Sequence, residues 1–429
     1  MYDWTSYLFA DIEGYIIQRH LQLCSKFVSR INNLASFKST LAALQTFIPT
    51  NYSFKSSNPC WYAELFIPPT LNQNLTGRIR DTLPQIPTWY IEEEASKLIE
   101  LVKTNDSLTR NRTLFCLPSL YVSGFQKCSS TALYDLITTH PQVAPPRWKE
   151  GHFWRTLLNT GPKSYKSLQV LHYLFHLKPA ADAIERNPRG ITLDASTSTV
   201  LAGLNDKRTD NSDACIVPSI VSSILPDAKY ILIMRNPVDR LWSDYWYFCA
   251  DEVWRQSGRA MTIPREYLLH GPEIFHNHTM EVITEFNACV SSREAPEFEC
   301  VRRASFGQKS EYGCQYARVG IGLYYYHIVN WLSTIARKRF LFLRSEDLHA
   351  NPYLEMLNVW QFLGLRPLSS EWLGVSHSNT NKWIRSKRYR NKFQIMNETR
   401  EALKSFYHPY NERLAKLLND SRFLWNNAT

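Results

Sequence analysis

From Leu114 onward, short apolar runs alternate with patterns typical of helices. Three runs read as strands, at residues 114–122, 230–234 and 340–343, and residues 191–193 suggest a fourth. The run at 230–234 is apolar throughout, as expected of a strand that is buried on both faces of a sheet. This alternation predicts an α/β fold with a central, mainly parallel sheet flanked by helices.

The N-terminal part of the chain has a weaker pattern. Turn signals stand at Asn58-Pro59 and Pro68-Pro69, without a clear succession of elements between them. We therefore expect an N-terminal region, residues 1–112, that packs on a catalytic domain formed by residues 113–429. Charged residues interrupt the first thirty positions, which contain neither a signal-peptide core nor an apolar run long enough to span a membrane.

Functional residues of parallel sheets tend to lie just past the carboxyl ends of the strands. The run at 114–122 is followed there by a loop and a helical pattern, and the loop reads Gly124-Phe125-Gln126-Lys127-Cys128-Ser129-Ser130-Thr131. Backbone N–H groups, the helix N-terminus and the Lys127 cation would hold a phosphate. An ordinary Ser/Thr helix cap explains the same segment equally well. The Walker A pattern GxxxxGK[ST] is absent.

A second loop follows the run at 230–234 and reads Arg235-Asn-Pro-Val-Asp-Arg-Leu-Trp-Ser243. Pro237 suits the first position of a helix, which places Ser243 about two turns inside it. Arg235 and Ser243 can then reach one phosphate, through a guanidinium fork and a hydroxyl. A surface arginine and an unrelated helix serine are the alternative, but the lysine-containing loop before them favours a shared site.

Together the two loops resemble the 5′-phosphosulfate and 3′-phosphate loops of sulfotransferases that use 3′-phosphoadenosine 5′-phosphosulfate (PAPS). The similarity runs from about residue 58 to about residue 426, with supporting segments at 58–62, 344–348 and 406–414. The chain is identified as a member of the PAPS-dependent carbohydrate sulfotransferases. Within them it is most similar to enzymes that sulfate the 6-hydroxyl of N-acetylgalactosamine 4-sulfate.

This resemblance implies a P-loop-like sulfotransferase fold, PAPS as donor, a glycosaminoglycan acceptor and no required metal. It also implies a type II membrane protein of the Golgi lumen, whose anchor is missing from this sequence. Lys127, Ser130 and Thr131 would face the 5′-phosphosulfate, and Cys128 and Ser129 would complete that loop. The family usually has Gly at the position of Ser129, which would allow a positive φ or a close approach to phosphate. By the same resemblance, Arg235 and Ser243 would hold the 3′-phosphate.

The segment Lys149-Glu150-Gly151-His152-Phe153 resembles the Glu-X-His-Phe-Phe segment of heparan sulfotransferases, in which the Glu is the base. By resemblance Glu150 is the catalytic base, His152 its neighbour in the site, and Lys149 a substrate contact. A solvated Glu with a capping His is the alternative, and His152 is itself a candidate base.

Two further segments are candidates for contacts with substrates. Asp194-Ala-Ser196 resembles the acceptor-side segment of the family, although a strand end with a helix cap explains it equally well. The basic strip Lys382–Lys392 contains Arg385, Lys387 and Arg388, and in related sulfotransferases a basic loop near this place closes over the nucleotide. Such a strip can also grip a sulfated polymer, bind nucleic acid or form a solvated face.

The composition says more about the cellular compartment of the protein than about the reaction it catalyses. A formal net charge of +10 favours an anionic partner, but it does not distinguish between nucleic acid, an acidic membrane surface and a polyanionic sugar. Eight Asn-X-Ser/Thr sequons and nine cysteines favour the secretory pathway. A disulfide between Cys289 and Cys300 would close a short loop, and the resemblance suggests Cys60 with Cys116. The sequons are at Asn51, Asn74, Asn105, Asn111, Asn277, Asn397, Asn419 and Asn427.

Two other classes of function remain open. A nucleotide kinase would need a Walker A loop and a Mg²⁺-binding Asp at a strand end, and neither is evident. A non-catalytic protein that binds sulfated glycans and derives from a sulfotransferase is the second alternative, because Ser129 departs from the family and no anchor is present.

Overall fold

A parallel sheet of five strands forms the centre of the computed structural model, in the order β4-β5-β3-β6-β7. Every neighbouring pair in it is parallel. The structure describes residues 42, 44–45, 48–49, 58–63, 113–159, 163–202, 216–247, 265–293, 295–306, 317–371 and 394–426. The strands are β3 (Leu120–Gly124), β4 (Val143–Ala144), β5 (Ile191–Asp194), β6 (Lys229–Met234) and β7 (Phe340–Arg344).

The strands predicted at 191–193, 230–234 and 340–343 are confirmed as β5, β6 and β7. The single strand predicted at 114–122 is wrong, because that run divides into β2 (Thr113–Cys116) and β3. Pro118 lies at the break and has no N–H to donate to a ladder. Only β3 joins the central sheet, whereas β2 pairs antiparallel with β1 (Cys60–Ala63).

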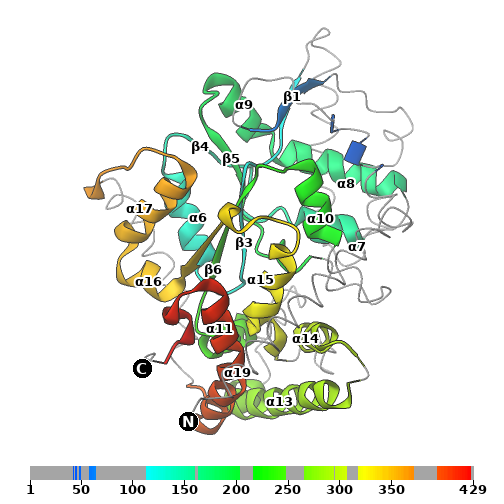
Figure 1. The fold of residues 1–429 in the computed structure, drawn as a ribbon, viewed down its shortest axis with the longest axis vertical. Coiled ribbons are helices and arrows are strands. Elements are labelled where there is room, and N and C mark those ends of the chain that lie inside the picture. The colour runs from blue at the N-terminus through cyan, green and yellow to red at the C-terminus, as the bar shows by residue number, and fades with distance from the viewer. Residues whose placement is uncertain are drawn as a thin grey trace, which may run out of the picture.

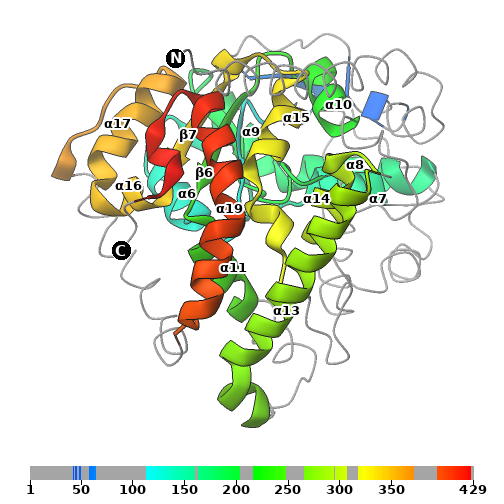
Figure 2. The same ribbon diagram turned by 60° about the horizontal axis from the view of Figure 1, so that its bottom comes forward.

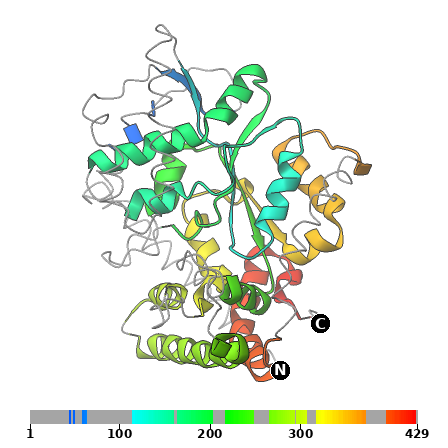
Figure 3. The same cartoon turned by 180° about the vertical axis from the view of Figure 1, so that it is seen from behind.

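Helices cover both sides of the sheet, which confirms the predicted α/β fold (Figure 1). In Figure 1, α6, α16 and α17 lie to one side of the strands and α8, α10 and α15 to the other, and the reverse view in Figure 3 agrees. Their bounds are α6 (Ser130–Thr138), α8 (Lys163–His176), α10 (Ile216–Ile224), α15 (Tyr324–Leu332), α16 (Ser345–Ala350) and α17 (Pro352–Leu363).

The remaining helices surround the sheet and the helices that flank it. The long helices α13 and α19 lie side by side at one end, as Figure 2 shows. The bounds are α7 (Phe153–Asn159), α9 (Lys178–Arg186), α11 (Pro237–Tyr245), α13 (Arg265–Ser292), α14 (Glu297–Ser305) and α19 (Asn397–Leu418), with short 3₁₀ turns η3 (Val319–Gly322), η4 (Arg337–Arg339) and η6 (Ser421–Leu424). A disulfide between Cys289 and Cys300 joins α13 to α14, as expected. None of the helices that the structure describes combines the length and apolarity that a bilayer crossing requires.

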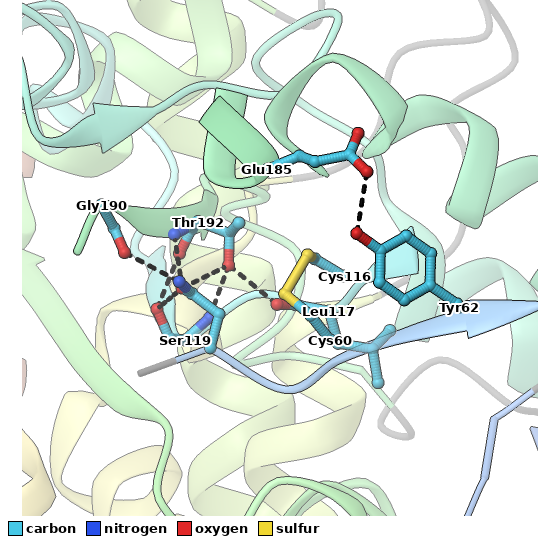
Figure 4. Close-up of a disulfide and its surroundings, with 9 residues drawn as sticks. Cys60, Tyr62, Cys116, Leu117, Ser119, Glu185, Gly190 and Thr192 are labelled. Atoms are coloured by element: carbon cyan, nitrogen blue, oxygen red, sulfur yellow. Dashed lines mark hydrogen bonds between the residues drawn. A yellow bond between two sulfur atoms is a disulfide. The ribbon is translucent and has the colours of Figure 1, made fainter. Parts of the chain in front are cut away.

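A short N-terminal segment is fastened to the start of β5 (Figure 4). The disulfide Cys60–Cys116 links β1 to β2, as the resemblance suggested. Beside it, the side chain of Asn58 donates to the Gly190 carbonyl at 2.7 Å and accepts from Thr192 N–H at 2.8 Å. Since Asn58 is buried, these bonds are shielded from water, and they fix residues 58–63 against β5. The wider division into 1–112 and 113–429 stays a prediction.

Candidate active site

The first predicted loop joins β3 to α6 and has an unusual backbone. Lys127 and Ser129 both have φ of 67°, in the left-handed region, and Cys128 between them does not. Alternation of this kind turns successive N–H groups to one side and forms a concave anion site. Ser129 is the N-cap of α6, but its side chain makes no capping hydrogen bond. The amides of the first helical turn are therefore available to a phosphate-like group, with the positive end of the helix dipole behind them.

The Lys127 ammonium lies over the ring of Tyr247, 3.8 Å from the ring centroid. Tyr247 lies just beyond α11, so this contact brings the lysine of the first loop towards the helix of the second. A cation–π contact at an exposed ring is worth about 0.5–1 kcal/mol, which a bound anion can outcompete. This contact holds Lys127 near the site.

The second predicted loop lies beside the first because β3 and β6 are neighbours in the sheet. Arg235 follows the last residue of β6, and the Asn236 side chain caps α11 by accepting from Val238 N–H at 3.0 Å. Pro237 begins the helix, as predicted. Tyr324 connects the two loops, since its hydroxyl donates to the Arg235 carbonyl at 2.8 Å and lies 3.6 Å from the Cys128 sulfur.

Ser243 lies inside α11, and its hydroxyl is buried without a hydrogen-bond partner among the residues that the structure describes. Buried hydroxyls nearly always have a partner, so this one is free to bond to a ligand or a water molecule. Arg235 is half-buried and takes part in no ion pair within the described part of the chain. An uncommitted guanidinium at the strand end and an unsatisfied hydroxyl two turns into the helix fit the 3′-phosphate predicted for them.

The thiol of Cys128 is buried, so any contact of this residue with the predicted donor would have to come from its backbone. The side chain is fully buried, and this burial raises its pKa to about 11, so the thiol stays neutral near neutral pH. Arg240, from the same helix as Ser243, is also fully buried and contacts Asp244 at 3.4 Å and the Arg318 carbonyl at 2.8 Å. These contacts anchor α11 against η3, so Arg240 supports the loop.

The carboxylate of Glu150 lies at the edge of the first loop. Thr197 N–H donates to its Oε2 at 3.1 Å, and the Lys149 ammonium contacts its other oxygen. The same ammonium lies 3.4 Å from the hydroxyl of Ser130, the first residue of α6. Lys149 therefore bridges the predicted base and the predicted phosphosulfate loop, and brings together two segments assigned to one reaction.

His152 shares this cluster. Its Nδ1 lies 2.8 Å from the Ser198 hydroxyl and 3.7 Å from Oε2 of Glu150, and its backbone N–H donates to the Ser196 hydroxyl at 2.9 Å. Burial lowers the pKa of the imidazole below its ordinary value, so the neutral ring prevails near neutral pH. A neutral imidazole can accept a proton, so His152 stays an alternative base.

Asp194 ends β5 and is fully buried behind this cluster. Tyr173 donates to one carboxylate oxygen at 2.5 Å and Ser196 N–H to the other at 2.7 Å, while burial raises the carboxyl pKa. Both oxygens are thus engaged in shaping the turn after β5. The geometry favours a supporting role for Asp194, and a direct acceptor contact by Asp194 or Ser196 stays a prediction.

Several contacts of the site were not predicted from the sequence. Thr197 and Ser198 position Glu150 and His152, and the signal for them was the hydroxyl-rich run that directly follows β5. No local pattern predicts the contacts of Tyr247 and Ser345 with the first loop, because each comes from a segment more than a hundred residues away. Thr131 lies half-buried in the first turn of α6. The strip residues Arg385, Lys387 and Arg388 lie outside the described residues.

A groove of about 770 Å³ opens at the opposite, amino edge of the sheet. Ser119, Ile191 and Lys229 line it, at or just before the starts of β3, β5 and β6. It contains none of the predicted site residues and is separate from the two loops. Within the described part of the chain, no group of three or more His, Cys, Asp or Glu side chains is placed to hold a metal.

The known proteins that resemble this chain are sulfotransferases. Residues 117–408 match the sulfotransferase domain family, a span that includes both loops, Glu150 and α16. The chain belongs to the sulfotransferase domain family. Among curated proteins it is 26% identical to carbohydrate sulfotransferase 15 of Homo sapiens, over 93% of this chain and 70% of that protein.

Other sulfotransferases are similar over shorter spans. Bifunctional heparan sulfate N-deacetylase/N-sulfotransferase 2 of Bos taurus is 22% identical, over 73% of this chain and 31% of that protein. The sulfotransferase of Alicyclobacillus acidocaldarius, a solved structure, superimposes with a TM-score of 0.41 at 18% identity and covers 71% of this chain and 96% of that one.

Proposed function

We propose that this sulfotransferase moves a sulfuryl group from PAPS to a hydroxyl of a glycosaminoglycan sugar. The observation that carries the proposal is the meeting of two phosphate-type loops at the carboxyl ends of β3 and β6, with a carboxylate at their edge. The unsatisfied Ser243 hydroxyl and the uncapped first turn of α6 support two anionic groups on one donor. The similarity to carbohydrate and heparan sulfate sulfotransferases supports a carbohydrate acceptor.

The chemistry follows from the positions of the charged groups. Glu150 accepts the proton of the acceptor hydroxyl as the new O–S bond forms and the bond from sulfur to the phosphate oxygen breaks. Lys127 and the amides of α6 stabilise the negative charge that grows on the departing phosphate. The reaction resembles phosphoryl transfer, in which the protein contributes chiefly positioning and charge stabilisation.

The likeness to carbohydrate sulfotransferase 15 favours a finer assignment, the 6-hydroxyl of N-acetylgalactosamine 4-sulfate in chondroitin or dermatan sulfate. Residence in the Golgi lumen is the matching location. Two disulfides and exposed asparagines in the sequons at Asn277, Asn397 and Asn419 support a secretory route. Attachment to the membrane belongs to the same proposal.

Calorimetric titration with 3′-phosphoadenosine 5′-phosphate, the desulfated donor product, tests the proposal. The sulfotransferase should bind this nucleotide more tightly than ATP and should also bind chondroitin 4-sulfate. A preference for ATP would indicate a kinase. Binding of the polysaccharide without any nucleotide would indicate a glycan-binding protein that has lost the activity of its family.

A further inference from the structure

The hydroxyl of Ser129 is directed away from its own helix. It lies 2.6 Å from the Ser345 hydroxyl and 3.3 Å from Nε2 of His349, both on α16. Ser129 is the N-cap of α6 and yet caps no amide of that helix. Ser345 is almost fully buried and Ser129 is half-buried, so the hydrogen bond between the two serines is partly shielded from water.

This position places two demands on a residue other than glycine. At φ of 67°, Ser129 adopts the left-handed backbone that glycine enters freely and other residues enter only at a cost. In its preferred N-cap conformation, a serine hydroxyl accepts from an amide of the first turn. Such a cap would occupy an amide that the phosphosulfate needs. A hydrogen-bond partner outside α6 would stabilise the left-handed backbone of Ser129 and would also keep its hydroxyl away from the amides of the first turn.

The first residues of α16 also contact the second loop. Glu346 Oε1 accepts a hydrogen bond from the backbone N–H of Asn236 at 2.7 Å, directly after Arg235. Ser345 and Glu346 therefore bind one loop each, and α16 fixes both loops relative to the end of β7.

We propose that Ser345 is a positioning residue for the donor site. Its hydrogen bond holds Ser129 in the left-handed conformation and keeps the Ser129 hydroxyl from capping α6, so that the amides of the first turn stay open to the donor. This hydrogen bond therefore allows a serine at a position where the loop would otherwise favour a glycine. This inference rests on the proposed function, because it concerns how the same loop receives PAPS.

The test is a double-mutant cycle of Ser345→Ala and Ser129→Gly, read out as affinity for 3′-phosphoadenosine 5′-phosphate and as KM for PAPS. In the Ser129 background, Ser345→Ala should weaken nucleotide binding about three- to tenfold, the effect of one shielded hydrogen bond. The KM for PAPS should rise by the same factor, with kcat at saturating donor much less affected. In the Ser129→Gly background the same substitution should change affinity by less than about twofold, as for uncoupled sites.

Glu346→Ala is the matched control, because it breaks the contact of α16 with the other loop. It should weaken nucleotide binding by the same factor in both backgrounds. If Ser345→Ala does not fold, Ser345→Cys serves in the same cycle, since a thiol keeps the size of the side chain but is a weak hydrogen-bonding group.

If Ser345→Ala weakens nucleotide binding by the same factor in both backgrounds, the inference is overturned, because Ser345 would then act by a route other than Ser129. Unchanged nucleotide affinity in both backgrounds would also overturn it. These outcomes leave the proposed function intact, whereas an unmutated chain that binds no 3′-phosphoadenosine nucleotide would refute the proposed function itself.

Discussion

Thr197 holds the carboxylate of Glu150 with two groups, its backbone N–H at 3.1 Å and its hydroxyl at 3.2 Å from the same oxygen. One residue from the turn after β5 thus fixes the orientation of a side chain from the segment after β4. A base must lie within hydrogen-bond reach of the proton it takes, so its orientation bears directly on the rate.

Thr197→Val tests this contact, since it removes the hydroxyl and keeps the shape and the backbone N–H. We expect kcat to fall about three- to tenfold, the effect of one hydrogen bond in a partly buried site, with little change in affinity for the donor product. Steady-state kinetics with PAPS and chondroitin 4-sulfate measure it. Thr284→Val on the exposed surface of α13 is the control and should leave kcat as it is. An unchanged kcat in Thr197→Val would show that the backbone N–H alone positions the carboxylate.

Glu150→Gln should lower turnover by about 10²–10⁴-fold, the usual contribution of a positioned general base. The amide keeps the shape of the side chain and cannot accept the proton, while nucleotide binding should stay close to that of the unmutated chain. His152→Ala should cost less, because His152 lies beside Glu150 and Ser198 as a neighbour. Near-normal turnover in Glu150→Gln together with loss of activity in His152→Ala would transfer the role of base to the histidine.

Arg235→Ala should weaken binding of 3′-phosphoadenosine 5′-phosphate by about 1.5–3 kcal/mol, as for a lost hydrogen bond to a charged group. Ser243→Ala should cost about 0.5–1.5 kcal/mol by the same reasoning for a neutral hydroxyl. Calorimetry gives both values, and Arg303→Ala, at an exposed position of α14, is the control. Normal affinity in a folded Arg235→Ala variant would place the 3′-phosphate elsewhere.

Stability should fall as the pH drops from about 6.5 towards about 4, partly because of His327. Its ring is fully buried, its Nε2 lies 3.0 Å from the Gly320 carbonyl, and burial lowers its pKa from 6.5 to about 4. In that window the unfolded chain takes up a proton that the folded chain does not, which favours unfolding by up to about 1.4 kcal/mol per pH unit. Thermal unfolding at several pH values should show a shallower slope for His327→Gln. An identical slope would exclude His327 as a source of the acid sensitivity.

The sequence indicates the strand ends better than it indicates what surrounds them. Arg235 and Lys127 follow runs whose apolar pattern shows where β6 and β3 end, and the parallel sheet brings them together. The break at Pro118 was missed because the apolar residues continue across it. The hydrogen bond between Ser345 and Ser129 joins residues 216 positions apart. It depends on tertiary packing, which no local sequence pattern encodes.

A sulfate transfer assay shows whether this protein is an active carbohydrate sulfotransferase. The chain is incubated with PAPS labelled at sulfur and with chondroitin 4-sulfate, and the label in the polysaccharide is counted and located by disaccharide analysis. We expect labelled sulfate at the 6-hydroxyl of N-acetylgalactosamine 4-sulfate, and transfer about 10²–10⁴-fold slower in Glu150→Gln. A chain that binds both PAPS and the polysaccharide but leaves all label on the nucleotide, across chondroitin, dermatan and heparan acceptors, would contradict the proposed function.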